Sequence, residues 1–377
     1  MKKILPRLAL LALPFVLYYA VFLIFEPYDY FGVKGGAVNE DSVITRVRAY
    51  LSAPENAVIL GDSRMAHFDP AAVEAASGRK WSNLAFGGAS LGESIDLFYM
   101  AAEKNPALNT CYFGVSFYTL RAGDDRSRTG AIETVASNPA AYLLNFDYNA
   151  DMLNELLLRL QGVQTGATRD AGSWEEADYL DEHGAPLPYR RNLIAYAATL
   201  YANLARPDTL PAIETSAYTD AHGAPRERCE NPAALTDAMR RASPADSAYT
   251  LNEENLRRLA EVADFCAARG IALTFVLPPV DKALHEFLLT PLGLEPQMQS
   301  IRAALLATGA RVRDFEVEPE YTFEEEQYYD GFHLDVERGL PQFTQILFGL
   351  PVSPPQGRGN TGYPGRGEEG VSGSLGA

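Results

Sequence analysis

Two separated stretches of the chain alternate short apolar runs with helical periodicity, and this alternation is the strongest constraint on the fold. Residues 57–116 read as strand, helix, strand, helix and strand. Residues 252–348 resume the pattern with a capped helix, a continuous apolar run at 271–277 and a further strand at 311–315. Strands that alternate with helices form parallel sheets covered on both faces. We therefore expect an α/β domain of three α/β/α layers, with a parallel sheet of about five strands.

Residues 1–25 predict a transmembrane signal-anchor. Three basic residues, Lys2, Lys3 and Arg7, precede an uncharged run of 18 residues at 8–25. As a helix of about 1.5 Å per residue, this run would be about 27 Å long, close to the hydrocarbon thickness of a bilayer. The next charges are acidic, which favours a single-pass protein with its N-terminus in the cytoplasm and its main domain outside. A cleaved signal peptide is the alternative, although no small-x-small cleavage site follows the run.

The rest of the chain divides into a linker, one large domain with an insertion, and a tail. Residues 26–56 read as a juxtamembrane linker with a short helix at 41–52. The α/β pattern of residues 57–350 is interrupted at 120–250, where the periodicity is helical at 139–161 and 192–204. We expect this helical insertion to lie at the sheet's edge, where it can line or cover the functional site. The tail, residues 351–377, is rich in Gly and Pro and is expected to be disordered.

Charge and cysteine usage exclude several kinds of function. The 377 residues carry 32 basic and 49 acidic side chains, a formal net charge of −17. Because phosphate binding needs a basic surface, no nucleic acid is expected as a partner. Cys111, Cys229 and Cys266 are too few and too scattered for a disulfide framework or a zinc site, and only a Cys111–Cys229 pair is left open. His183 and His222 lie in turn-like repeats without ligand spacing, so we expect no metal and no cofactor.

Loops at the predicted carboxyl ends of strands carry residues suited to acyl-ester chemistry. Ser63 and Gly88 follow the first and second apolar runs, and Asp330 and His333 follow the last strand. Open α/β sheets bind their ligands at this edge. A serine nucleophile needs a base to take its proton and an acid to orient that base, roles that His333 and Asp330 can fill. The backbone N–H groups of Ser63 and Gly88 would face the oxyanion, where one donor contributes about 3 kcal/mol.

These loops resemble the motifs of the SGNH (GDSL-type) hydrolases. The similarity covers residues 57–116 and 252–348 and lies in three blocks, Gly61-Asp62-Ser63, Asn83-Leu84-Ala85-Phe86-Gly87-Gly88 and Asp330-Gly331-Phe332-His333. Each motif alone is common, and the signal comes from their order and their positions after strands. The resemblance implies an SGNH/flavodoxin-like fold, a triad of Ser63, His333 and Asp330, and Gly88 as the oxyanion glycine. Asn83 either ties the loop after the second strand or faces the substrate.

One donor of the family's oxyanion hole is missing. The family supplies an asparagine after the third strand, where this chain reads Gly114-Val115-Ser116-Phe117-Tyr118 and leaves Ser116 as the substitute donor. A divergent site behind one N-terminal anchor is similar to the DltD-like and alginate O-acetylation branch. That resemblance implies a cell-surface polysaccharide or polymer as substrate and a membrane-bound O-acyltransferase as partner.

Two functions follow from these patterns. The first is serine-dependent acyl-ester hydrolysis or acyl transfer on a cell-envelope glycan or polymer. The alternative is a non-catalytic envelope scaffold of the same fold, which binds polymer or the acyltransferase. A Ser63 Oγ more than about 5 Å from both ring nitrogens of His333 would favour the scaffold, since proton transfer needs hydrogen-bond distance. Arg64 either meets an anionic substrate or is exposed, and His67 is expected at the rim of the site.

Overall fold

The computed structural model describes residues 4–33, 42–123, 127–160, 189–219 and 225–349. These residues contain a five-stranded sheet in the order β2-β1-β3-β6-β7, with every neighbouring pair parallel. Its strands are β1 (Ala57–Leu60), β2 (Ser82–Asn83), β3 (Thr110–Gly114), β6 (Ala272–Leu277) and β7 (Arg311–Asp314). The α/β class and the parallel five-stranded sheet predicted from the sequence are confirmed.

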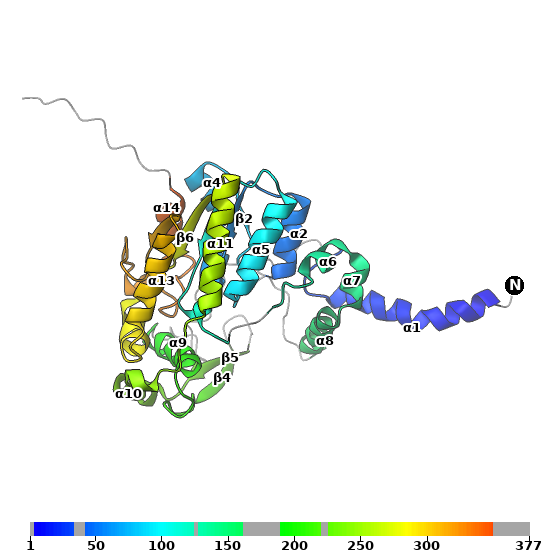
Figure 1. Ribbon diagram of the computed structural model, residues 1–377. Helices are drawn as coiled ribbons and strands as arrows, with labels where there is room; N and C mark the ends of the chain where they lie inside the picture. Colours follow the sequence, from blue (N-terminus) through cyan, green and yellow to red (C-terminus); the bar gives the residue numbers. More distant parts are fainter. Residues whose placement is uncertain (1–3, 34–41, 124–126, 161–188, 220–224, 350–377) are drawn as a thin grey trace, which may run out of the picture.

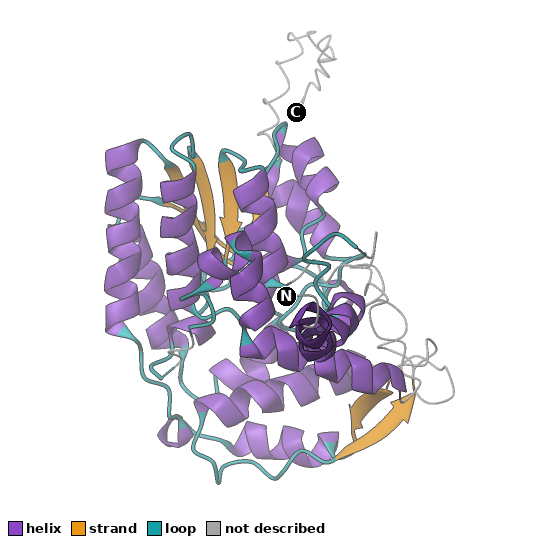
Figure 2. Ribbon diagram, turned by 90° about the vertical axis from the view of Figure 1, so that its right-hand side faces the viewer, coloured by secondary structure: helices purple, strands orange, loops and turns teal. Residues whose placement is uncertain are grey.

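Different helices cover the two faces of the sheet (Figures 1 and 2). One face packs against α2 (Val43–Ser52), α5 (Leu91–Lys104), α11 (Glu253–Arg269) and α13 (Glu295–Ala307), and the other against α4 (Pro70–Ser77) and α14 (Leu340–Phe348). Because side chains alternate along a strand, Val58 and Leu60 join the larger apolar cluster and Ile59 joins the smaller one. This arrangement fits three α/β/α layers.

Helix boundaries on the sheet follow local signals in the sequence. Asp69 is the N-cap of α4 and its carboxylate accepts the N–H of Ala72, with Pro70 in the first turn. Ser90 and Glu93 form a capping box at the start of α5. Gly270 ends α11 in the left-handed conformation, with φ of 68°, which glycine adopts without steric cost. Side-chain hydrogen bonds and glycine thus set these ends where the sequence predicts them.

The second strand is shorter than predicted. The apolar run at 81–86 predicts a strand of that length, whereas β2 spans Ser82–Asn83. The chain still follows β1, because Leu84 N donates to Ile59 O at 2.8 Å. However, the N–H of Ala85 donates to the Asn83 side chain at 3.0 Å. A side-chain acceptor therefore replaces the regular backbone pattern of this edge strand.

The region between β3 and α11 is largely helical, as predicted, but it is more divided than the periodicity indicates. It contains α6 (Ile132–Ser137), α7 (Pro139–Leu144), α8 (Phe146–Leu160), α9 (Tyr189–Leu204), the hairpin β4 (Thr215–Thr219) and β5 (Pro225–Cys229), and α10 (Pro232–Arg241). The single helix expected at 139–161 is two helices, because the Asn145 side chain accepts the N–H of Asp147 at 2.9 Å and caps a new helix. The hairpin was not predicted, since its strands are polar and carry little apolar alternation.

The N-terminal residues form α1 (Ile4–Phe25), which projects from the rest of the molecule (Figure 1). Among the helices that the structure describes, none is both long enough and apolar enough to cross a membrane. The anchor at residues 1–25 therefore stays a prediction. The tail predicted at 351–377 lies outside the described residues, as do His183 and His222.

The three cysteines are buried free thiols, so the Cys111–Cys229 disulfide left open by the sequence is not formed. Burial raises the pKa of Cys111 above its ordinary value and raises the pKa of Cys266 to about 12. Thiols of this kind stay protonated and unreactive at neutral pH.

Candidate active site

Ser63 lies where β1 ends at the carboxyl edge of the sheet. Gly61 follows β1 with φ of 138°, and a Cβ at that position would lie 2.9 Å from Met65 Cγ and 3.2 Å from Gly114 Cα. Only glycine fits this close approach of two strand ends. Asp62 then caps the short helix α3 (Ser63–Ala66), so that Ser63 is its first residue. The tight turn presents the serine hydroxyl at the edge where α/β sheets bind ligands.

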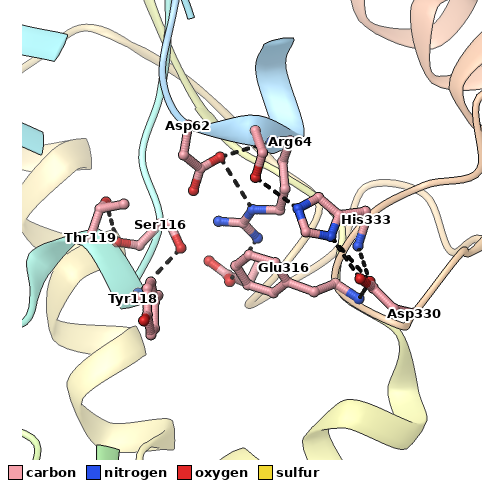
Figure 3. A network of polar contacts seen from close by, with 10 residues as sticks. Asp62, Arg64, Ser116, Tyr118, Thr119, Glu316, Asp330 and His333 are labelled. Atoms are coloured by element: carbon pink, nitrogen blue, oxygen red, sulfur yellow. Dashed lines mark hydrogen bonds and ion pairs between the residues drawn. The ribbon is translucent and has the colours of Figure 1, made fainter. Parts of the chain in front are cut away.

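Ser63, His333 and Asp330 form a connected triad. The Oγ of Ser63 lies 2.7 Å from Nε2 of His333. On the other side of the ring, Nδ1 of His333 lies 2.9 Å from Oδ2 of Asp330 (Figure 3). With the proton on Nδ1 donated to Asp330, Nε2 is free to accept the serine proton. The Asp330 side chain is 5% exposed and that of His333 is 16% exposed. The base is therefore oriented by a buried acid while it remains reachable from the surface.

Backbone N–H groups of the loop that carries Asp330 and His333 hold the Asp330 carboxylate in place. Oδ1 of Asp330 accepts the N–H groups of Phe332 at 3.0 Å and His333 at 2.8 Å. Gly331 has φ of 79°, which turns the chain between them. Its carbonyl oxygen accepts the N–H of Asp281 at 2.8 Å. Every carboxylate oxygen of Asp330 thus has a partner, and the acid is fixed before any substrate binds.

A second group of charges lies buried beside the triad. The Arg64 guanidinium has Nε 3.6 Å from the Asp62 carboxylate, Nη1 3.5 Å from the Glu316 carboxylate, and its carbon 4.1 Å from the ring centre of Phe332 (Figure 3). Its side chain is 2% exposed, which excludes the exposed position considered for it. None of its three nitrogens makes a hydrogen bond among the described residues. Burial raises the pKa of Glu316 to about 7, and the nearby Arg64 charge opposes that rise.

The backbone donors expected for the oxyanion are available. The N–H groups of Ser63 and Gly88 make no hydrogen bond within the described part of the chain. Gly88 has φ of 62°, and its carbonyl oxygen accepts Nη2 of Arg128 at 2.6 Å. Arg128 is held in turn by the buried Glu93 carboxylate at 2.8 Å. Burial would raise the pKa of Glu93, but the hydrogen bonds from Arg128 and Ser90 hold it below its ordinary value.

The two remaining predicted site residues, Asn83 and Ser116, form hydrogen bonds with neighbouring backbone groups. The side-chain nitrogen of Asn83 donates to the carbonyl oxygens of Met65 at 2.9 Å and Ala66 at 3.1 Å, which favours the tying role over substrate contact. The hydroxyl oxygen of Ser116 accepts the N–H of Tyr118 at 3.2 Å. Ser116 is 2% exposed, and Figure 3 shows it and His333 on opposite sides of the Arg64 guanidinium.

A surface pocket borders the triad. Its lining is mostly apolar and comes from the loop after the last strand together with α3, in the residues His67, Tyr329, His333, Leu334, Asp335 and Val336. His67 therefore lies at the rim of the site, as expected. The pocket therefore lies beside the base of the triad.

Two residues of the site were not identified from the sequence. The ring of Tyr196, on α9 of the insertion, lies 5.3 Å from the His333 ring and 5.7 Å from the Phe332 ring between centres. The insertion therefore places one aromatic ring beside the base, through a residue whose helical periodicity carried no functional signal. Glu316 did carry a functional signal in the sequence, because it lies two residues after the end of β7, at the carboxyl edge of the sheet.

No family model matches the chain, and no curated protein is significantly similar to it. Among the described residues, no group of three or more His, Cys, Asp and Glu side chains could hold a metal ion. What the site can do is therefore judged from its geometry, which is that of a serine, a histidine and an acid within hydrogen-bond distance of one another.

Proposed function

We propose that this chain is a membrane-anchored serine esterase or O-acyltransferase of the SGNH type, which acts on acyl esters of a cell-envelope glycan or polymer. The observation that carries the proposal is the 2.7 Å contact between Ser63 Oγ and His333 Nε2, with Asp330 on the opposite ring nitrogen. Serine, base and acid in this arrangement can form and break an acyl-serine ester.

The proposed reaction has two halves. Ser63 Oγ attacks the ester carbonyl while His333 Nε2 takes its proton, and Asp330 stabilises the resulting imidazolium. The carbonyl oxygen becomes an oxyanion, to which the unbonded N–H groups of Ser63 and Gly88 can donate. His333 then returns the proton to the departing alkoxide. In the second half, His333 deprotonates either water or an acceptor hydroxyl, which attacks the acyl-enzyme and releases Ser63.

The substrate class rests on the expected location and on the resemblance of the motifs. A domain held outside the cytoplasm by residues 1–25 would meet envelope polymers rather than small cytoplasmic esters. The acceptor would be a sugar or polyol hydroxyl if the enzyme transfers acyl groups, and a membrane-bound O-acyltransferase would then be its partner. Tyr196 packs edge-on against the His333 ring, and this supports transfer, since an aromatic neighbour limits the access of water on that side of the base.

The experiment that tests this proposal is covalent labelling by a fluorophosphonate probe, which reacts with an activated serine. The chain should be labelled, and both Ser63→Ala and His333→Ala should abolish the labelling. Ser42→Ala serves as the matched control, because the Ser42 side chain bonds to Thr45 at the start of α2 and not to the triad, so labelling should be unchanged. Full labelling of Ser63→Ala, or of His333→Ala, would contradict the proposal.

The scaffold alternative retains one supporting observation, the absence of an asparagine after β3. The distance between Ser63 and His333 argues against it, because 2.7 Å is well within the reach needed for proton transfer. Measuring the acyl content of surface polymers in cells with Ser63→Ala separates the two functions. A scaffold would keep the acyl content of the parent, whereas an enzyme would change it.

A further inference from the structure

An exposed apolar stripe runs along α8, outside the site described above. Phe146, Leu153, Leu157 and Leu160 are 82%, 47%, 55% and 74% exposed, and Leu144 at the end of α7 is 75% exposed. The four α8 positions recur at helical spacing and so lie on one side of the helix. Met152 and Glu155, between them in the sequence, are buried. The helix therefore turns an apolar face to the outside, which soluble surfaces seldom present.

The helix that carries the stripe lies beside α1, which also exposes apolar residues. Hydrogen bonds join Tyr18 to Asn149 at 2.6 Å and Tyr28 to Asp151 at 2.7 Å, so that α8 lies beside the C-terminal part of α1 (Figure 1). The exposed apolar side chains of α1 are Leu10, Leu11, Leu13, Phe15, Val16, Leu17 and Ile24. The last turns of α1 and the neighbouring α8 therefore both expose apolar side chains in the same part of the molecule.

Buried polar and aromatic contacts prevent the two helices from moving independently. The Glu26 carboxylate, at the end of α1, accepts the N–H groups of Tyr28 and Tyr30 at 2.9 and 3.0 Å and the hydroxyl of Tyr142 at 2.7 Å. The rings of Tyr30 and Tyr142 stack with centres 4.0 Å apart. Because Tyr142 belongs to α7, which leads directly into α8, these contacts fix the direction of α1 relative to the stripe.

We propose that the α8 stripe seats in the interfacial layer of a lipid bilayer. An amphipathic helix with aliphatic and aromatic side chains on one face binds such a layer by burying that face. The stripe carries no cation, and the chain has a net charge of −17, so the binding is apolar rather than an attraction to anionic lipid. A zwitterionic bilayer is the expected surface. The stripe would then hold the α/β domain in one orientation against the membrane, whether or not Ser63 is a nucleophile.

Depth-dependent fluorescence in the full chain tests this docking. Leu157→Cys can be labelled selectively with an environment-sensitive dye, because the three native cysteines are buried. In phosphatidylcholine vesicles with a spin-labelled lipid, the dye should shift to shorter wavelength and be quenched about threefold more than at a matched control position. Leu306→Cys on α13 is that control, since Leu306 is also a half-exposed leucine, at 48%. Equal quenching at both positions would overturn the proposal.

A second variant separates docking from the fold and from other occupants. Leu157→Glu combined with Leu153→Cys should lose the lipid quenching seen with Leu153→Cys alone, because a charge on the stripe opposes burial in the interface. Circular dichroism and urea unfolding of the same variant report its fold and should be unchanged, and they do not depend on the reactivity of Ser63. A dye that shifts to shorter wavelength without lipid quenching would show that a protein, or a second copy of this chain, covers the stripe, and would also overturn the proposal.

Discussion

Two polar networks meet at the carboxyl edge of the sheet, and they are built differently. In the triad, hydrogen bonds of 2.7 to 2.9 Å join Ser63 to His333 and His333 to Asp330. In the neighbouring network, Arg64 lies 3.5 Å from Glu316 and makes no side-chain hydrogen bond among the described residues. Fully paired buried groups give a site one geometry, whereas loosely paired buried charges cost desolvation energy that their attraction only partly offsets. The difference predicts that the triad determines activity and that the second network determines stability and its response to pH.

The largest effect is expected from Asp330→Asn, which breaks the triad with little change in shape. An amide cannot orient the imidazole as the carboxylate does or stabilise its charged form. We expect acyl-ester turnover to fall by about 10³- to 10⁴-fold, with a change in the free energy of unfolding that is far smaller than the change in the activation barrier. Steady-state kinetics and urea unfolding measure the two. A turnover within a few fold of the parent would show that the acid has no part in the reaction.

Arg64→Ala should reverse this balance between activity and stability. Removing one partner leaves Glu316 buried without its counter-charge and removes the cation from the Phe332 ring, so we expect a loss of about 3 kcal/mol in the free energy of unfolding. The double variant Arg64→Met with Glu316→Leu should recover much of that loss, because well-packed apolar pairs often replace buried ion pairs. Urea unfolding of the three variants measures the recovery. A double variant no more stable than Arg64→Ala would show that the ion pair is well matched.

Glu316→Gln tests how the second network responds to pH. The pKa of Glu316 is raised to about 7 in the folded chain from 4.5, so the folded state holds a proton that the unfolded state releases. The parent therefore loses stability as pH rises from about 4.5 to about 7, by about 1–3 kcal/mol. The variant has no such carboxyl group and should gain stability relative to the parent over that range. Unfolding measured from pH 4.5 to 8 gives the difference.

The exposed carboxylate of Glu103 supplies the control for that experiment. Glu103 is solvated in both states, and its side chain is 77% exposed. Glu103→Gln should therefore show no systematic change in relative stability across the same pH range. A parallel course for Glu316→Gln and Glu103→Gln would mean that Glu316 is not protonated in the folded chain near neutral pH.

The same contrast explains how much of the site the sequence could predict. Ser63, Gly88 and His333 were identified because each follows a predicted strand, and strand ends share one edge of a parallel sheet. The Asp69 cap and the Gly270 stop depend on neighbours within a few residues, so they too were predicted. Tyr196 was not predicted, because its contact with the His333 ring joins residues 137 positions apart through the packing of the insertion.

Arg64 shows the other limit of the sequence. Its position next to Ser63 can be read from the sequence. Its burial, however, depends on Glu316 and Phe332, which contact it in space but lie more than 250 positions later in the sequence. Sequence periodicity predicts which face of a helix or strand is apolar. It does not predict which charged side chain will be buried by a loop that lies far away in the sequence. The triad could be predicted because its parts are chemically distinctive, while the network beside it became visible only in the packed structure.

The smallest effect is expected from Ser116→Ala, which tests whether the triad borrows a donor from the other side of Arg64. Ser116 accepts the N–H of Tyr118, so losing its hydroxyl should cost about 1 kcal/mol of stability. If its hydroxyl also served the oxyanion, turnover would fall by about 10²- to 10³-fold with little change in KM. Because Ser116 is buried and lies across the Arg64 guanidinium from His333 (Figure 3), we expect kcat to stay within about threefold of the parent. A larger fall confined to kcat would identify Ser116 as the substitute for the missing asparagine and would join the two networks into one site.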